Sequence, residues 1–205
     1  MLKLYDMQRS GNAYKARLML GLLGLAHQTQ TVDLAKKEQL APWFVAINPL
    51  HTVPVIDDDG LVIRDSAAVL VYLAAKYDAA RTWYPADPKG MAEVQQWLAY
   101  ANNEILHNLA AARAIGNGMR PGNLAEAQDK ARGVLAFIEA SLKGRGFLVG
   151  EQPTVADVAC YPYCAFIHQA EIALSDYPSI AAWCARIEAL KGYVALPPRP
   201  PRPAT

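Results

Sequence analysis

Three short segments place small polar residues, or a proline, where the chain is expected to turn. Ser10 and Asn12 belong to the segment RSGN, which separates a short apolar run from an amphipathic stretch. Asp65 and Ser66 stand at the head of a second amphipathic stretch, and Pro54 interrupts the apolar run VPVI. A hydroxyl and free backbone N–H groups at a helix start favour an anion, but Ser and Asp are also ordinary helix caps. The residue types therefore predict anion-binding helix starts, plain caps, or both at once where a cap uses only some of the free N–H groups, and Pro54 indicates an irregular strand edge.

The elements that must hold these residues alternate between strand and helix. Residues 2–6 predict a strand, and a second short strand is predicted within 27–34. Between them, one face of a helix is formed by Tyr14, Leu18, Leu22 and Leu25. The segment 51–67 predicts a hairpin with DDDG as its turn, followed directly by another helix. The order is β-α-β, then β-β-α.

The second half of the chain shows only helical spacing. Apolar residues step by threes and fours within 91–109, 124–142 and 180–190. The segment DAARTWYPADPKG that precedes them has two prolines and no periodicity, and the proline-rich end LPPRPPRPAT cannot hold a helix. We therefore predict an α/β domain at 1–79, a linker at 80–87, an all-helical domain at 88–196 and a disordered tail at 197–205.

Composition limits the classes of protein that fit. Of the 205 residues 53% are hydrophobic, which allows a packed core, and the net charge of +1 gives no attraction to nucleic acid or to an anionic membrane. The longest apolar run, LMLGLLGLA, is too short to span a bilayer, and the first residues lack a signal-peptide pattern. The three cysteines, Cys160, Cys164 and Cys184, form no CxxC motif. We expect a cytoplasmic protein without a disulfide framework.

Four motifs, in order and spacing, resemble the cytosolic glutathione S-transferase family over nearly the whole chain. They are RSGN (9–12), NPLHTVP (48–54), RDSAAVLVYL (64–73) and FLVGEQPTVADVA (147–159). The resemblance implies a thioredoxin-like N-terminal domain followed by an all-α C-terminal domain. It also implies glutathione as co-substrate, a homodimer, and contact faces on the helix 65–77 and a long helix 88–115.

The resemblance assigns a ligand role to the hairpin and to the helix after it. In this family the Val53–Pro54 bond is cis, and the turn offers the N–H and C=O of Val53 to the cysteinyl backbone of glutathione as an added strand. Ser66 would take the γ-glutamyl carboxylate at the helix start, and Asp65 would take the ammonium group, where Glu is the commoner choice. Relatives often place Lys, Arg or Gln before the Val-Pro pair, whereas this chain has His51 and Thr52. Lys36 and Lys37 could assist from the preceding loop.

Activation of the glutathione thiol needs a donor at the first helix. A free thiol has a pKa near 8.5, and one hydrogen bond to a charged group contributes about 1.5–3 kcal/mol, enough for roughly two pKa units at 1.36 kcal/mol each. Serine-type members of the family, with a zeta-like motif, place a hydroxyl at the position of Ser10. The residues matching Gly11 and Asn12 are serine and cysteine in that motif, and Asn12 could donate its amide instead. Tyr5 is a third candidate, although it falls within the first strand. The absence of cysteine from the first domain excludes a mixed disulfide at this site.

Other chemistry-bearing residues give weaker signals. Cys160, Cys164 and His168 share a helical spacing, but the stretch is apolar, so we predict no metal site. Thr154 and Asp157 form a capping-box pattern with a structural role. Candidates to line the second-substrate site are Met7, Gln8, Arg9, Asn103, His107 and Arg113; for each of the last three, solvated surface is the favoured interpretation.

The sequence therefore predicts a bacterial-type glutathione transferase that joins glutathione to a small hydrophobic or electrophilic substrate. Two alternatives remain open: an isomerase or peroxidase that uses the same thiolate, and a non-catalytic glutathione-binding regulatory protein.

Overall fold

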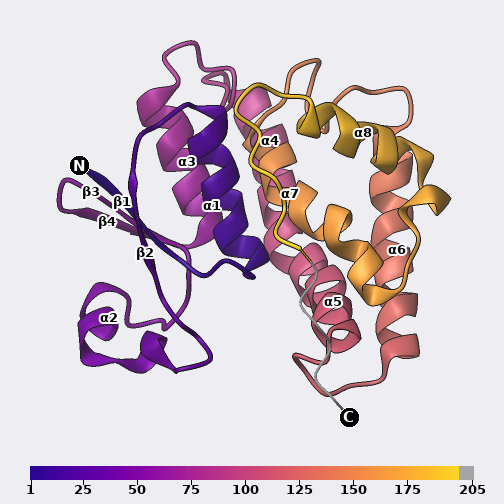
Figure 1. The fold of residues 1–205 in the computed structure, drawn as a ribbon. Coiled ribbons are helices and arrows are strands. Elements are labelled where there is room, and N and C mark those ends of the chain that lie inside the picture. Colours follow the sequence, from indigo (N-terminus) through magenta and orange to yellow (C-terminus); the bar gives the residue numbers. More distant parts are fainter. Residues whose placement is uncertain (199–205) are drawn as a thin grey trace.

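The computed structural model describes residues 1–198 and contains an N-terminal α/β domain packed against a helical domain (Figure 1). Most of the predicted proline-rich tail, residues 199–205, lies outside the described part of the chain. The last helix of the first domain ends at Tyr77 and the first helix of the second begins at Pro88. The intervening residues form the connection between the domains.

A four-stranded sheet with strand order β2-β1-β3-β4 forms the N-terminal domain. Its strands are β1 (Leu2–Asp6), β2 (Gln28–Thr31), β3 (Val55–Asp58) and β4 (Leu61–Arg64). β1 runs parallel to β2 and antiparallel to β3, and β3 and β4 form the predicted hairpin. The helices are α1 (Gly11–Leu22), α2 (Pro42–Ile47) and α3 (Ser66–Tyr77), with a short turn η1 (Glu38–Leu40) before α2.

The alternation of side chains along the strands divides the sheet into two faces. Leu4 and Ile56 point to the face covered by α1 and α3, and they belong to the main core that continues into the helical domain. Tyr5 and Val55 belong to a smaller core with Phe44 of α2. As a result α1 and α3 lie between the sheet and the helical domain, and α2 lies away from it (Figure 1).

Strand register gathers three chain segments at one end of the sheet. Tyr5, near the end of β1, pairs with Val55 at the start of β3. Val55 in turn pairs with Arg64 at the end of β4. The residues after β1, the residues before β3 and the residues after β4 are therefore neighbours.

A long helix and a buried central helix organise the C-terminal domain. The long helix consists of α4 (Pro88–Tyr100), a π-helical segment η2 (Ala101–Ala110) and α5 (Ala111–Gly116), which follow one another directly. The remaining elements are α6 (Leu124–Leu142), α7 (Val155–Ala165), η3 (Phe166–Ala170), η4 (Leu174–Asp176) and α8 (Pro178–Glu188). All of α7 from Val155 to Cys164 is buried. The predicted capping box of Thr154 and Asp157 starts α7 and is confirmed.

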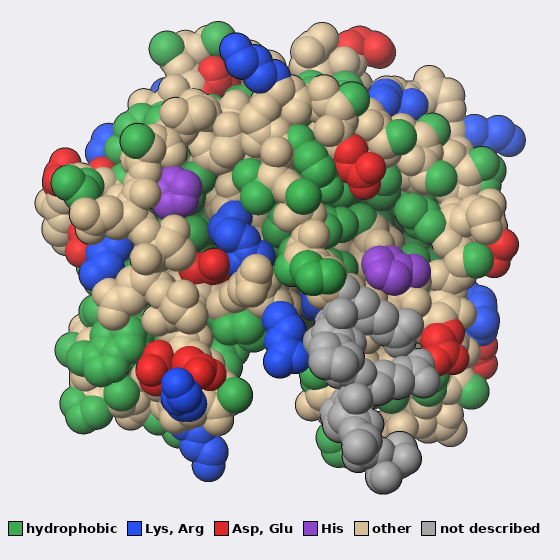
Figure 2. Space-filling model, in the orientation of Figure 1, with side chains coloured by type: hydrophobic (Ala, Val, Ile, Leu, Met, Phe, Trp, Pro, Cys, Tyr) green, Lys and Arg blue, Asp and Glu red, His purple; other side chains and the backbone are tan. Residues whose placement is uncertain are grey.

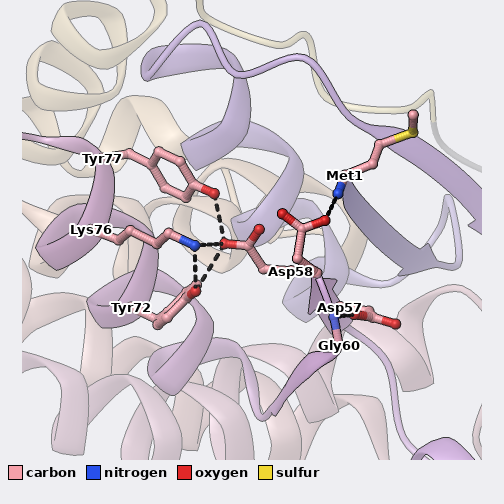
Figure 3. A network of polar contacts seen from close by, with 8 residues as sticks. Met1, Asp57, Asp58, Gly60, Tyr72, Lys76 and Tyr77 are labelled. Atoms are coloured by element: carbon pink, nitrogen blue, oxygen red, sulfur yellow. Dashed lines mark hydrogen bonds and ion pairs between the residues drawn. The ribbon is translucent and has the colours of Figure 1, made fainter.

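A group of polar side chains fixes α3 to the end of β3 (Figure 3). The buried Asp58 carboxylate accepts hydrogen bonds at Oδ2 from Lys76 Nζ at 2.6 Å, from the Tyr77 hydroxyl at 2.6 Å and from the Tyr72 hydroxyl at 2.8 Å. Burial alone would raise the pKa of Asp58, but these donors together lower it to about 2. The carboxylate is therefore ionised throughout the neutral range.

The two domains share one hydrophobic core and are linked by helix packing and by a side-chain hydrogen bond. α1 packs on α7, and the Tyr14 hydroxyl donates to the Val194 carbonyl in the segment after α8. Within residues 1–198, no helix is both long and apolar enough to cross a bilayer.

Candidate active site

The starts of α1 and α3 and the turn before β3 meet beside the helical domain. They are neighbours because the strand register places their flanking strand ends together. Figure 2 shows the surface hollowed between the α2 region and the helical domain, with Lys and Arg side chains at the head of the hollow. The connection between β1 and α1 lies there in the same view (Figure 1). The starts of two helices therefore lie together in a region where Lys and Arg side chains reach the surface, an arrangement that favours an anionic ligand.

Two arginines hold the loop that joins β1 to α1. Arg17 of α1 donates to the Gln8 carbonyl at 2.8 Å and pairs with the buried Asp6 carboxylate. Arg113 of α5 donates from Nη2 to the Arg9 carbonyl at 3.1 Å. The backbone directly before Ser10 is thus fixed from both domains.

Ser10 is the N-cap of α1. Its Oγ accepts the Ala13 N–H at 3.1 Å, which uses a lone pair and leaves the hydroxyl proton free to donate. The side chain is half-buried, so the hydroxyl is not fully enclosed by the protein. The cap and a donor to a ligand sulfur are therefore compatible roles.

Asn12 is oriented by a tyrosine from the helical domain. The Tyr163 hydroxyl donates to Asn12 Oδ1 at 3.4 Å, and burial raises the pKa of Tyr163 to about 12, so the hydroxyl remains protonated. This leaves the Asn12 amide N–H groups without a partner in the described residues. The Tyr163 ring also explains Gly11, because a Cβ there would lie 2.6 Å from ring carbons. The serine of the zeta-like motif has no room at this position.

The Val53–Pro54 peptide bond is cis, as the resemblance implies. The N–H and C=O of Val53 make no hydrogen bond within residues 1–198, although the side chain is buried. Asn48 fixes the preceding backbone by donating to the Thr52 carbonyl at 2.8 Å. An extended ligand could therefore pair with Val53 as an added strand.

Asp65 and Ser66 form the start of α3. Asp65 has a positive φ of 72° and caps the helix, with Oδ1 accepting the Ala67 N–H at 2.8 Å. Its second carboxylate oxygen makes no hydrogen bond in the described chain and can accept from an ammonium group. The Ser66 hydroxyl and N–H likewise have no partner there, so they can bind a carboxylate in the field of the helix dipole.

The side chains before Val53 are exposed hydrogen-bond donors that are less firmly positioned than Ser10 or Ser66. His51 is exposed, and its Nδ1 lies 3.0 Å from the Gln39 carbonyl oxygen. Thr52 is exposed, and its Oγ1 accepts a hydrogen bond from Asn48 at 3.3 Å. Lys36 is exposed and lies 3.5 Å from the Asp33 carboxylate, and Lys37 is also exposed.

Several other candidates have positions that the sequence could not give. Tyr5 is buried in the small core between Phe44 and Trp43, so it is an interior side chain. Arg113 is not solvated surface: it is 5% exposed, donates to Gln169 at 2.8 Å and lies over the Phe166 ring.

The structure does not bring the remaining two candidates of the long helix to the Ser10 loop. Asn103 bonds back to the Ala99 carbonyl, and His107 borders a small hollow against α6. Met7, Gln8 and Arg9 do lie in the loop itself, where Met7 is half-buried.

The cysteines are interior side chains rather than ligands. All three are buried, and burial raises the pKa of each thiol, which keeps them unreactive. His168 is exposed, away from the buried Cys160 and Cys164. Among residues 1–198, no three His, Cys, Asp or Glu side chains are grouped to hold a metal.

Two residues near the site were missed from the sequence. Tyr163 lies 151 positions after Asn12, and no local pattern links them. Lys15 is a charged residue on an otherwise buried stretch of α1, and this break in the apolar pattern was the available signal.

A four-stranded sheet with a cis-proline turn, two polar helix starts and an appended helical domain defines a thioredoxin-like, ligand-binding class of protein. The glutathione S-transferase N-terminal domain model matches residues 9–76, and the C-terminal domain model matches residues 121–186. The chain belongs to the glutathione S-transferase family.

Individual relatives agree with this assignment. Glutathione S-transferase D7 of Drosophila melanogaster is 31% identical over 185 residues, which cover 89% of this chain and 82% of the relative. The crystal structure of a glutathione S-transferase from Pseudomonas fluorescens has a TM-score of 0.88 and 31% identity over 95% of this chain and 98% of its own. A glutathione transferase homologue from Lodderomyces elongisporus, described with two GSH per subunit, has a TM-score of 0.84 and 25% identity over 93% of this chain and 94% of its own. The serine-type, zeta-like assignment of this chain stays a prediction.

Proposed function

We propose that this chain binds glutathione in the hollow at the sheet end, ionises its thiol and transfers the thiolate to a small electrophile. The observation that carries the proposal is the convergence of unpaired polar groups there: the Val53 backbone, the Ser66 N–H and hydroxyl, and the Ser10 hydroxyl. Each matches one part of a γ-glutamyl tripeptide. A family member with these groups intact retains the means to bind glutathione.

In this proposal the cysteinyl backbone pairs with Val53, and the γ-glutamyl carboxylate binds Ser66 at the start of α3. The ammonium group binds the free oxygen of Asp65. The thiol then lies at the start of α1, where Ser10 donates its hydroxyl and Asn12 its amide. Both hydrogen bonds strengthen as the sulfur becomes negative, so they favour the thiolate.

The thiolate attacks the electrophilic carbon from the side of the helical domain. A carbon–sulfur bond forms as the leaving group departs with its electron pair, or as the electron pair of an activated double bond shifts. Met7, Gln8 and Arg9 are proposed to contact the second substrate, because they are part of the loop that leads to Ser10. Arg113 supports this loop from behind through the Arg9 carbonyl.

The direct test is glutathione-dependent conjugation of a chlorodinitrobenzene, followed by absorbance. We expect activity in the wild type and a loss of about 10²–10³-fold in the double variant Ser10→Ala/Asn12→Ala, the range seen when a stabilising donor is removed from a developing anion. Activity with an isomerisable or peroxide substrate but not with any conjugation substrate would favour the first alternative. Glutathione binding without turnover would favour the regulatory alternative.

We further propose a cytoplasmic homodimer. Trp97, Tyr100 and Phe137 form an aromatic cluster on α4 and α6, with ring centres 4.9–5.8 Å apart, and Phe137 is 51% exposed. The cluster borders a depression of about 580 Å³. An exposed aromatic group of this kind is typical of an interface, and a second copy presents the same surface. Buried, unpaired cysteines suit the reducing cytoplasm.

A further inference from the structure

Lys15 is a fully enclosed cation without a hydrogen-bond partner. It lies on α1 one turn after Asn12, its side chain is buried, and Nζ has no partner in the described residues. Nζ lies 5.7 Å from the centre of the Tyr163 ring, which is a weak attraction. Buried lysines are usually paired with an acid, so this side chain requires an explanation.

Lys15, on α1, lies among residues of two further helices. α1 packs on α7, which contributes Cys160 and Tyr163, and on α3, whose N-cap is Asp65. Burial lowers the pKa of Lys15 to about 8, and Cys160 and Asp65 oppose this effect. Asp65 does not touch Lys15, because its carboxylate caps α3 instead. The side chain thus remains mainly an ammonium group at neutral pH.

The neighbouring cation on the same helix shows the contrast. Arg17 pairs with Asp6 and is also held by two backbone carbonyls. Lys15 has no such partner, although a methionine would fill a similar volume without the cost of a buried charge. A charge kept at this cost next to a ligand site is a candidate for function.

Lys15 lies one turn from the start of α1. Gly11 and Lys15 are four residues apart and share one helix face, and both face the Tyr163 ring: a Cβ at Gly11 would lie 2.6 Å from ring carbons, and Lys15 Nζ lies 5.7 Å from the ring centre. The enclosed region between them has a low effective dielectric constant, so a charge acts there over a longer range than in water. The field of the ammonium group adds to that of the helix dipole.

We propose that the ammonium group of Lys15 is an internal counter-charge for glutathione, stabilising the bound thiolate through the first turn of α1. This inference rests on the proposed function. Ser10 and Asn12 touch the sulfur in that account, whereas Lys15 acts through its field alone. It therefore affects the ionisation of the thiol more than the binding of the peptide.

The test compares the pKa of bound glutathione in wild type, Lys15→Met and Lys130→Met, using thiolate absorbance. Lys130 is an exposed lysine of α6 paired with Glu126, so its variant is a control for the loss of one positive charge. We expect Lys15→Met to lower the thiolate fraction of bound glutathione by about tenfold near neutral pH, which corresponds to one pKa unit, and Lys130→Met to change nothing. S-methylglutathione has no ionisable thiol, and its affinity should stay within about twofold in both variants, since the effect acts on the sulfur charge.

Several outcomes would overturn this inference. An unchanged thiol pKa in Lys15→Met would remove Lys15 from the ionisation, and an equal loss of affinity for S-methylglutathione would assign it to peptide binding or to structure. Lys15→Gln serves as a second neutral variant should Lys15→Met fail to fold. A wild type that does not bind glutathione would contradict the proposed function itself, a result distinct from binding without an effect of Lys15.

Discussion

Ser10 and Asp65 each combine a structural and a ligand-binding role by using different atoms. Ser10 accepts the Ala13 N–H and keeps its own proton, and Asp65 caps α3 with one oxygen and keeps the other. From the sequence, an N-cap is the alternative to a ligand role for Ser10, whereas both roles are compatible at the Asp65-Ser66 helix start. The structure makes the two compatible at Ser10 as well, because a cap needs only an acceptor.

The closeness of Gly11 to the Tyr163 ring predicts what a larger residue would do at this position. In Gly11→Ala the new Cβ would lie 2.6 Å from a buried ring, so either the ring or the start of α1 must move. We expect a loss of about 1–3 kcal/mol in the free energy of unfolding, as for other overpacked sites, together with reduced glutathione affinity. Urea unfolding and a glutathione titration measure the two effects.

Gly133→Ala provides the matched control. Gly133 lies within α6, and a Cβ there meets no atom within 4 Å. This variant should gain about 0.5–1 kcal/mol, because alanine is the better helix former. Equal effects of the two substitutions would show that the Tyr163 contact does not constrain the start of α1.

The position and role of a residue could be predicted where they follow local rules, and less well where they depend on the fold. The positions of Ser10, Pro54 and Asp65 at turns and helix starts follow from local patterns. Tyr163 and the burial of Arg113 arise from packing between residues far apart in the chain, which one sequence does not reveal. The order of the four motifs along the chain still indicated the family.

At the scale of elements, the hairpin and α3 depend on one of three consecutive aspartates. Asp57, Asp58 and Asp59 look equivalent in the sequence, but only Asp58 is buried, and it accepts the three hydrogen bonds from α3. The strand alternation places Asp58 inward, whereas Asp59 lies at the turn. The helix 88–115 was predicted as one long element, and its π-helical centre was not, because residues such as ANNEILHNLA fit either helix type.

Asp58→Asn should therefore loosen the docking of α3. Because the pKa of Asp58 is lowered to about 2, its ionised form contributes stability above about pH 4, and this contribution is lost as the pH falls through 2. We expect a loss of about 1–2 kcal/mol at pH 7, discounted because Lys76 is half-exposed and screened. Chemical unfolding at pH 7 and near pH 2 should show this difference at pH 7 and its disappearance at the acidic end.

Asp59→Asn is the control for this prediction. Asp59 is exposed on the same turn and pairs with the N-terminal amine, so its loss should change stability by less than about 1 kcal/mol. If both variants lost stability equally, the polar group around Asp58 would not be what fixes α3.

At the scale of the whole molecule, the aromatic cluster of Trp97, Tyr100 and Phe137 predicts self-association. Phe137→Glu would place a charge in the middle of this surface and should shift the protein from dimer to monomer, a change that analytical ultracentrifugation measures directly. Glutathione binding by the monomer should survive, because the proposed site is built from one chain.

A matched exposed position tests the specificity of that effect. Ala136→Glu changes the neighbouring exposed residue of α6 by the same charge and should leave association largely intact, since Ala136 is outside the cluster. A wild-type monomer would contradict the proposed dimer, and a dimer that survives Phe137→Glu would place its interface elsewhere.

Some features of the two-domain arrangement can be predicted from the sequence, and others cannot. The change from strand–helix alternation to helical spacing predicts two domains, and α4 begins within the predicted second one. Contacts such as Tyr14 with Val194 join residues 180 positions apart and could not be inferred from periodicity. The position of the site, between the domains, depends on both kinds of information.

The most direct test of the central claim is the pKa of the glutathione thiol in the bound state, followed by thiolate absorbance in wild type and Ser10→Ala. We expect the pKa of the bound thiol to lie well below its free value of about 8.5 in the wild type, and Ser10→Ala to move it back towards that value. A thiol that binds the wild type with an unshifted pKa would contradict the claim that this site activates glutathione. A shift that survives Ser10→Ala would contradict the role of Ser10 and transfer it to Asn12.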